Sequence, residues 1–396
     1  MGFDDTFNTE SLLPDVISFR DRFPIFHNKI HLASNAMGAV SDATEEAYRS
    51  YLDDRIHYGA SWEAALSKQE ELRKSFADFI NAKPSEIAIC YSATQGLGVL
   101  STSINWLNRR KIIFDDYNFP SVAQLWHAQK LRGAEVVRIS PDSEEIIRPE
   151  YVANALDKDV GLISVSHVCY KNGHRLDLEG LGKRVRHADA LYLVDDYQGC
   201  GTRKIDVNAL GIDIYVGGAV KFLLGSAGIG FLFVKEDLLE TLHPTLTGWF
   251  GQKASYEMEI EAHEEAADAS RFQIGTPSVP AIYESLAGLN LINSVGINNV
   301  EKWISYITSL VIHRLIEEGF VLATPLDPQR RAAQVAIKSI DGVKVVSELQ
   351  KRGIITTTRD NNIRTAWHFY NTPEDVDALI SALQDLRDLM LFDHLQ

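Results

Sequence analysis

The chain has 396 residues, of which 45% are hydrophobic and 23% are charged, and its formal net charge is −15. Such a length and composition predict a globular protein with a large buried core and room for two domains. The acidic balance and the lack of a long Lys/Arg block argue against nucleic acid or an anionic membrane as a partner.

The cysteines and the N-terminus exclude several other classes. Cys90, Cys169 and Cys200 are an odd number at wide spacing, which fits neither a disulfide framework nor a CxxC metal pair. The first ten residues are acidic and have no apolar core, so they do not predict a signal peptide. No run of about 18 apolar residues could span a membrane. We therefore expect a cytoplasmic protein, and without a His/Cys cluster we predict no metal site.

The predicted elements begin with an arm and a short helix within residues 1–30. Helices follow over residues 41–54, capped by Ser41, and over residues 62–81. Seven apolar runs, most of them separated by helical segments, then predict strands over residues 87–91, 111–114, 135–139, 161–165, 191–195, 212–216 and 228–234. This alternation predicts an α/β fold with a mostly parallel sheet covered by helices on both faces.

The pattern changes after about residue 280. Two long helices are expected first, and a smaller α+β set follows, with segments over residues 279–295, 298–318, 334–337, 354–357, 363–367 and from 372 onward. We predict an arm of residues 1–40 associated with a small domain of residues 279–396, and a large domain of residues 41–278. Active sites in open α/β sheets lie at the C-terminal ends of strands, so the loops there are expected to carry the chemistry.

A lysine lies just beyond one of these strands. Lys221 follows the run at residues 215–220 and precedes a turn with Gly225, Gly228 and Gly230, which permit unusual dihedral angles and close backbone approach. A lysine in this place can form an imine with an aldehyde cofactor. The alternative is a surface lysine beside a tight turn.

Three further segments carry polar groups suited to a cofactor site. Asp195 ends an apolar strand, where a buried carboxylate needs a cationic partner such as a protonated pyridine nitrogen; a helix cap or a metal ligand is the alternative. Ser92 to Gln95 join a strand to a helix, where amides and a hydroxyl can bind phosphate, unless Ser92 or Thr94 is a plain cap. Arg364 lies on a late strand, where it can bind a substrate carboxylate or form a surface ion pair.

In this order and spacing the segments resemble the class V aminotransferase family of fold-type I enzymes, which use pyridoxal 5′-phosphate (PLP). The family includes cysteine desulfurases, kynureninases and isopenicillin N epimerase-like proteins, and the resemblance covers residues 31 to about 383. It implies a large domain with a mostly parallel seven-stranded sheet flanked by helices, plus a smaller α+β C-terminal domain. It also implies that Lys221 forms a Schiff base with PLP.

The resemblance assigns the other cofactor contacts. Asp195, in the segment LVDDYQ, would pair with the pyridine nitrogen, and Gln198 would approach the phenolic oxygen or the imine. Ala93 and Thr94 would hold the phosphate. Phe119 would stack on the pyridine ring, as the matching phenylalanine does in kynureninases.

Further assignments concern the substrate and a second subunit. Arg364 would bind the α-carboxylate of an amino-acid substrate, and Asn35 lies in an Asn-x-x-Gly segment similar to an early kynureninase loop. Trp249 and Thr276 lie in segments that resemble those reaching the phosphate from the neighbouring subunit. The resemblance therefore implies a homodimer with composite active sites.

Departures from the family pattern indicate which branch of the family this chain resembles most. Cysteine desulfurases carry a nucleophilic cysteine shortly before the arginine that binds the carboxylate, whereas residues 353–363, which precede Arg364 here, contain no cysteine. Val220 stands where kynureninases have tyrosine, and Gln198 where they have histidine. We expect a kynureninase-like or C–S lyase-like enzyme that performs β-elimination on a cysteine-derived thioether or sulfoxide. The alternatives are hydrolytic Cβ–Cγ cleavage, transamination or decarboxylation-coupled oxidative deamination, and a non-enzymatic protein that retains the fold.

Three more polar residues have open or minor roles. His368 follows Arg364 by four positions, a spacing that on a strand puts both side chains on one face, and it is either a substrate contact or a core residue. Tyr170 either reaches the cofactor or substrate or is a packing residue. Asp196 is predicted to be structural, because its side chain should point away from that of Asp195.

Overall fold

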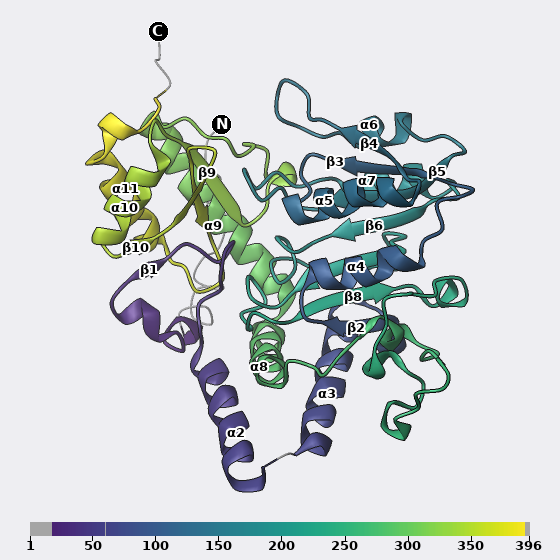
Figure 1. Cartoon of the computed structure of the whole chain (residues 1–396). Helices are drawn as coiled ribbons and strands as arrows, with labels where there is room; N and C mark the ends of the chain where they lie inside the picture. The colour runs from purple at the N-terminus through teal and green to yellow at the C-terminus, as the bar shows by residue number, and fades with distance from the viewer. Residues whose placement is uncertain (1–17, 60, 393–396) are drawn as a thin grey trace.

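The computed structural model describes residues 18–59 and 61–392, and a seven-stranded sheet lies at its centre (Figure 1). Its strand order is β2-β8-β7-β6-β5-β3-β4. The strands are β2 (Ile87–Cys90), β3 (Lys111–Asp115), β4 (Glu135–Ile139), β5 (Val160–Ser166), β6 (Leu191–Asp195), β7 (Ile214–Gly218) and β8 (Gly230–Val234). β8 runs antiparallel to both neighbours and the other pairs are parallel. The predicted α/β fold with a mostly parallel sheet is therefore confirmed.

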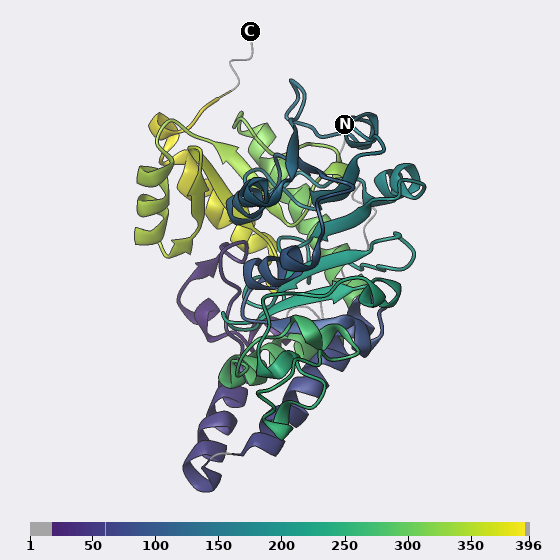
Figure 2. The ribbon, with the colours of Figure 1, turned by 45° about the vertical axis from the view of Figure 1, so that its right-hand side comes forward.

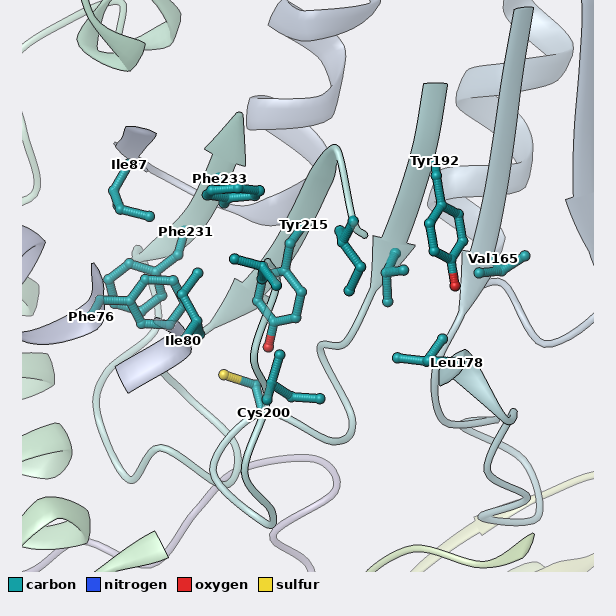
Figure 3. Packing of buried hydrophobic residues seen from close by; sticks show 14 of the residues in the cluster. Phe76, Ile80, Ile87, Val165, Leu178, Tyr192, Cys200, Tyr215, Phe231 and Phe233 are labelled. Carbon is teal, nitrogen blue, oxygen red and sulfur yellow. The ribbon is translucent and has the colours of Figure 1, made fainter. Parts of the chain in front are cut away.

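Helices cover both faces of the sheet because successive strand residues alternate between two cores. In β6, Tyr192 and Val194 belong to one core and Leu193 to the other. On the first face Phe76 stacks on Phe231, with ring centroids 3.8 Å apart (Figure 3). This face is covered by α3 (Trp62–Ile80), α6 (Pro149–Asn154), α7 (Leu178–Val185) and α8 (Val279–Val295), and the other face by α4 (Ala93–Ser103) and α5 (Pro120–Ala128).

A second sheet is built from C-terminal strands in the order β11-β12-β9, all antiparallel. Asp360 and Asn361 join β11 to β12 in a tight turn, and both have positive φ values, of 53° and 60°. Helices pack on this sheet around their own core. The elements are β9 (Gln334–Lys338), β11 (Thr357–Arg359), β12 (Asn362–Ala366), α9 (Ile297–Glu317), α10 (Gly342–Lys351) and α11 (Pro373–Gln384).

The N-terminal segment lies beside these C-terminal elements. β1 (Ile30–His31) pairs in parallel with β10 (Ile354–Ile355), as Figure 1 shows. Residues 1–17 of the predicted arm lie outside the described residues, and the domain boundaries at residues 40 and 278 remain a prediction.

Two helices, α2 (Asp42–Tyr58) and α3, project together from one end of the molecule in both views (Figures 1 and 2). α2 is capped as predicted, with Ser41 Oγ accepting a hydrogen bond from the Thr44 amide. Thr44 is also the one buried residue of α2, whose residues are all described. The helix runs four residues beyond the predicted end at residue 54. In residues 18–59 and 61–392, no helix combines the length and apolar character needed to cross a membrane.

The sheet topology brings several loops to one edge. β2, β3, β5, β6 and β7 end on the same side, because β8 is antiparallel to both β2 and β7. The segments that follow these strands, at residues 91–94, 116–119, 167–170, 196–198 and 219–221, contain five of the ten predicted site residues, and Asp195 lies at the end of β6.

Candidate active site

The converging loops enclose a cavity of about 270 Å³. The residues that were predicted to contact the cofactor within one chain all line it. Its walls are formed by Ser92, Ala93, Thr94, Tyr117, Phe119, Ser121, Val122, Ser166, Val168, Tyr170, Asp195, Tyr197, Gln198, Val220 and Lys221. Four other predicted site residues, Asn35, Trp249, Thr276 and Arg364, lie outside these walls.

Lys221 presents its amine inside this cavity, close to two aromatic rings. Its Nζ lies 4.6 Å from the ring centroid of Tyr197 and 5.8 Å from that of Phe119. Burial lowers the pKa of Lys221 to about 8, the charge of Asp195 opposes this, and Arg364 adds to the lowering. A substantial fraction of the amine is therefore neutral near pH 8, as a nucleophile or a base requires.

The backbone beside Lys221 is held by the N-terminal segment. The Gly38 amide donates a hydrogen bond to the Val220 carbonyl at 2.8 Å. A Cβ at Gly38 would lie 2.2 Å from the Lys221 carbonyl oxygen, so this close approach requires glycine. In the glycine turn that follows, Leu224 and Gly228 take positive φ values, of 57° and 98°, whereas Gly225 does not.

Asp195 ends β6 and is 4% exposed. One carboxylate oxygen accepts a hydrogen bond from the Tyr197 amide at 3.0 Å. Burial raises the pKa of Asp195 to about 6, although the Tyr197 amide and Lys221 act against this rise. The next residue, Asp196, is fully buried and bonds instead to His167 Nδ1 at 2.6 Å and to the Tyr215 hydroxyl at 2.9 Å. Asp195 is thus a buried carboxylate suited to a cationic group in the cavity, and Asp196 has structural partners.

The turn after β2 forms an anion seat at the start of α4. Ser92 Oγ caps the helix by accepting from the Gln95 amide at 3.1 Å. Among the described residues the amides of Ala93 and Thr94 have no hydrogen-bond acceptor, and Thr94 Oγ1 donates to Ser121 Oγ at 3.1 Å. Free amides at a helix N-terminus together with two hydroxyl groups are suited to bind a phosphate.

Four aromatic residues line the cavity, Tyr117, Phe119, Tyr170 and Tyr197, of which Phe119 was predicted to contact the cofactor and Tyr170 had an open role. Phe119 is 43% exposed and meets the edge of Tyr170, with centroids 5.2 Å apart. Tyr197 was not predicted as a site residue. Its ring lies on Gly218, where a Cβ would approach Tyr197 Cε2 to 2.1 Å. Burial raises the pKa of Tyr197 to about 12, so its hydroxyl stays protonated.

Arg364 lies on β12 behind the cavity wall. Its Nη1 donates to the Tyr170 carbonyl at 2.7 Å, and its buried Nε has no hydrogen-bond partner among the described residues. Burial lowers the pKa of Arg364 to about 10, and the nearby Arg359 adds to this. A buried guanidinium with an unused donor fits a carboxylate ligand.

Asn35 connects Arg364 to the cavity through a hydrogen-bond network. Its Nδ2 donates to Gln334 Oε1 at 2.6 Å, and Gln334 Nε2 donates to the same Tyr170 carbonyl at 3.3 Å. The Asn35 carbonyl accepts from Gln198 Nε2 at 3.2 Å. The structure therefore brings both predicted substrate-binding residues to the edge of the site.

Trp249 and Thr276 lie elsewhere on the surface. Trp249 belongs to the 3-10 helix η5 (Trp249–Gly251) and meets Trp62 edge to face, with centroids 6.2 Å apart. The Thr276 carbonyl accepts a hydrogen bond from the Tyr91 hydroxyl at 2.5 Å, and Tyr91 directly precedes Ser92 in the turn after β2. Neither residue reaches the cavity of its own chain.

His368 does not share a strand with Arg364, because β12 ends at Ala366, so the even spacing does not put the two side chains on one face. Its ring is fully buried; Nδ1 accepts from the Phe369 amide, and Nε2 donates to the Phe222 carbonyl at 2.9 Å. Burial lowers the pKa of His368 to about 4. These contacts support the core interpretation of His368 over the substrate contact.

Comparison with known proteins identifies the family. The model of the family described as "Aminotransferase class-V" matches residues 33–379, most of the chain. The chain belongs to the class V aminotransferase family. It is accordingly a PLP-dependent enzyme, and the resemblance seen in the sequence is confirmed.

Relatives of this class V enzyme differ in their named activities. An uncharacterized aminotransferase, YcbU, from Bacillus subtilis is 29% identical over 90% of this chain and 94% of its own. A kynureninase from Shouchella clausii is 26% identical over 92% and 90%. The apo structure of a cysteine desulfurase from Thermococcus onnurineus matches with a TM-score of 0.85 and 23% identity over 93% and 97%. The comparisons therefore establish the family and the fold but leave the reaction open.

The residues present in this class V enzyme fit PLP. The neutral fraction of the Lys221 amine suits the aldehyde, and the buried Asp195 suits the pyridinium nitrogen. The free amides of Ala93 and Thr94 suit the phosphate. The unused Nε of Arg364 suits an amino-acid carboxylate.

Replacing Gly218 with alanine is expected to weaken PLP binding about tenfold. The new methyl group would lie 2.1 Å from Tyr197 Cε2, so the ring must move. Overpacking of this kind costs about 1–3 kcal/mol, and about 1.4 kcal/mol is a tenfold change in Kd. Absorbance titration of apoprotein measures Kd, with Gly98→Ala as control because a Cβ there meets open space. An unchanged Kd for Gly218→Ala would contradict the role of Tyr197 as a wall of the cofactor site.

The rate of PLP association with apoprotein is expected to rise about tenfold per pH unit up to about pH 8 and then level off. Only the neutral amine attacks an aldehyde, and the pKa of Lys221 is lowered to about 8. Because Asp195 raises this pKa and Arg364 lowers it, Asp195→Asn should move the midpoint to lower pH and Arg364→Gln to higher pH. Stopped-flow absorbance measures the rates, and shifts in the opposite directions would contradict this electrostatic account.

Proposed function

We propose that this enzyme catalyses β-elimination on a cysteine-derived thioether or sulfoxide. The sulfur substituent would leave, and water would convert the remaining three-carbon fragment to pyruvate and ammonia. The observation that carries the proposal is a PLP site with a proton-accepting amine and a carboxylate-binding arginine, but with no cysteine on its wall.

The position of the desulfurase cysteine supports this choice. Residues 353–364 here contain no cysteine and form β10, β11 and the start of β12, joined by the turn at Asp360 and Asn361. This hairpin leaves no long loop that could carry a nucleophile into the site. A mechanism in which the protein accepts sulfur as a persulfide is therefore disfavoured.

The three cysteines of the chain do not replace that nucleophile. Cys90, Cys169 and Cys200 are buried and none lines the cavity. Burial raises the pKa of Cys90 to about 12 and that of Cys169 to about 11, and it also raises the pKa of Cys200. These groups remain thiols, which are poor nucleophiles. Reduced, unpaired cysteines also support our proposal of a cytoplasmic location.

Each residue of the site would have a separate role in this reaction. Bound PLP supplies an electron sink that stabilises negative charge at the substrate Cα. Arg364 would hold the α-carboxylate, with Asn35 and Gln198 fixing the edge of the site. The Lys221 amine would accept the α-proton. Asp195 would keep a proton on the pyridine nitrogen, because its carboxylate is buried there.

The test is product analysis with S-alkyl cysteines and their sulfoxides. PLP-loaded enzyme should release pyruvate and ammonia in equal amounts, measured by coupling pyruvate to NADH oxidation. Lys221→Ala is the control for background chemistry. Absence of pyruvate from every thioether and sulfoxide tested would overturn the proposal.

A second candidate is hydrolytic Cβ–Cγ cleavage, as the kynureninase name of a relative suggests. The Asn35 segment and Phe119 favour it, whereas Val220 and Gln198 depart from the kynureninase pattern. Release of anthranilate from kynurenine, without pyruvate from thioethers, would select it. Accumulation of the pyridoxamine form, with turnover dependent on a keto acid, would instead select transamination, and oxygen uptake with CO₂ release its oxidative variant.

We further propose a homodimer with composite active sites. The α2–α3 pair and the segment around Trp249 expose apolar side chains that a partner would cover: Tyr48, Leu52, Ile56, Tyr58, Trp62, Leu246, Tyr256, Met258 and Ile260. Trp249 and Thr276 lie outside their own cavity and would then contact the partner's phosphate.

Mixing two inactive variants tests this arrangement. Lys221→Ala and Trp249→Ala should each be inactive or weak, and mixed dimers should regain activity in one of their two sites. Light scattering should give twice the chain mass for each variant. Monomers with full activity would contradict the dimer.

A further inference from the structure

A larger cavity, of about 840 Å³, lies apart from the PLP site. It is bordered by α6, α7, the loop at residues 174–177 and residues 327–330, and it shares no lining residue with the PLP cavity. Its size is in the range of small-molecule sites. We name it the arginine cleft after its cationic lining residues, Arg148, Arg175, Arg184, Arg203, Lys204 and Arg330.

Most charges in the arginine cleft already have partners. Among the acidic lining residues, Glu179 forms an ion pair with Lys183, and Asp177 accepts a hydrogen bond from the Gly180 amide at the start of α7. Four of the cations are paired with carboxylates, namely Arg148 with Asp142, Arg184 with Glu150, Arg203 with Glu301 and Arg330 with Asp327. Within the described part of the chain, Arg175 and Lys204 have no carboxylate at ion-pair distance. Among the lining residues, six Arg/Lys side chains stand against four carboxylates, those of Glu150, Asp177, Glu179 and Asp327.

Two residues of the cleft, the buried His174 and the partly exposed Arg175, also have buried nitrogen atoms with unused hydrogen-bonding capacity. His174 is 2% exposed, and neither ring nitrogen has a partner among the described residues. Arg175 Nη2 donates to the Gln329 carbonyl, but its buried Nε has no partner there. Buried polar groups normally have hydrogen-bond partners, so the free nitrogen atoms of this cluster are suited to bind a ligand.

The electrostatics agree with this geometry. Burial lowers the pKa of Arg175 to about 10, and the positive charge of Arg203 adds to the lowering. Burial, Arg330 and Arg175 together lower the pKa of His174 to about 4. Burial is the larger cause of both shifts, and neighbouring cations add to it, whereas the carboxylates of Glu301, Asp177 and Asp327 act in the opposite direction on Arg175.

We propose that the arginine cleft binds a small molecule carrying a phosphate or carboxylate group, with Arg175 and Lys204 as its main contacts. A guanidinium offers two parallel donors to either group, and the ammonium of Lys204 adds charge. The ligand is separate from PLP and from the amino-acid substrate, because the two cavities have different walls. The proposal is independent of which reaction the enzyme catalyses.

The test uses PLP-loaded protein that has been reduced with borohydride, so that the cofactor's phosphate seat stays filled. Inorganic phosphate and succinate are titrated separately by calorimetry at constant ionic strength. We expect one site per chain, with affinity reduced about tenfold or more in Arg175→Gln and in Lys204→Gln. Lys204 is exposed, so its variant also guards against a folding defect in Arg175→Gln. Arg110→Gln, at a surface pair with Glu135, is the matched control and should bind normally.

The two probes separate the ligand classes. Binding of phosphate alone indicates a phosphorylated ligand, binding of succinate alone a carboxylate, and binding of both an oxyanion site that accepts either. No binding of either probe at about 10 mM, or affinity unchanged in both cleft variants, would overturn the proposal.

Discussion

Replacement of Lys221 by alanine is expected to lower kcat by about 10⁴-fold or more. The variant loses the amine that attaches the cofactor and the group that would accept the α-proton. Its fold should persist, because the removed side chain ends in a cavity. Steady-state pyruvate formation measures the loss, and circular dichroism checks the fold.

Lys235→Ala is the matched control for this prediction. Lys235 also follows a strand, β8, but its ammonium lies at the surface near Asp237, at 3.6 Å. This variant should retain the rate of the unaltered enzyme. A Lys221→Ala enzyme within tenfold of the unaltered rate would contradict the assignment of Lys221.

Asp195→Asn is expected to reduce kcat by about 10²–10³-fold while changing KM little. Asparagine has nearly the same shape and still accepts the bond from the Tyr197 amide, but it removes the buried negative charge. Loss of one partner of a buried charge pair costs about 3–5 kcal/mol, and about 1.4 kcal/mol is a tenfold change in rate.

Arg364→Gln should show the reverse pattern, with most of its effect in KM. The guanidinium would bind the carboxylate in the ground state and in the transition state alike, so its loss weakens uniform binding. Steady-state kinetics with one thioether substrate measures both variants. Equal effects of the two variants on kcat and KM would contradict their separate roles.

Much of the site could be predicted from the sequence because of where the polar residues occur. Asp195 ends an apolar strand, Lys221, Thr94 and Phe119 each follow one by a few residues, and parallel strands end at one edge of a sheet. Local pattern and topology together therefore place them in one cavity. The same logic failed for His368, because strand periodicity does not show where pairing ends.

Contacts between distant segments could not be predicted in this way. The importance of Tyr197 depends on Gly218, which lies on the neighbouring strand and leaves room for the ring. The arginine cleft depends on Arg175 meeting the chain at Gln329, which belongs to the other end of the sequence. The one signal for Tyr197 in the sequence is the pair of glycines at the end of β7, because adjacent glycines in a strand indicate that another group lies close to the backbone.

The central claim is that Lys221 holds PLP in a class V enzyme. The most direct test is borohydride reduction of the PLP-loaded protein followed by peptide mass spectrometry. We predict one pyridoxyl phosphate group per chain, located on Lys221 and absent from Lys221→Ala. A group attached mainly to another lysine, or no attached group in the unaltered protein, would contradict the claim.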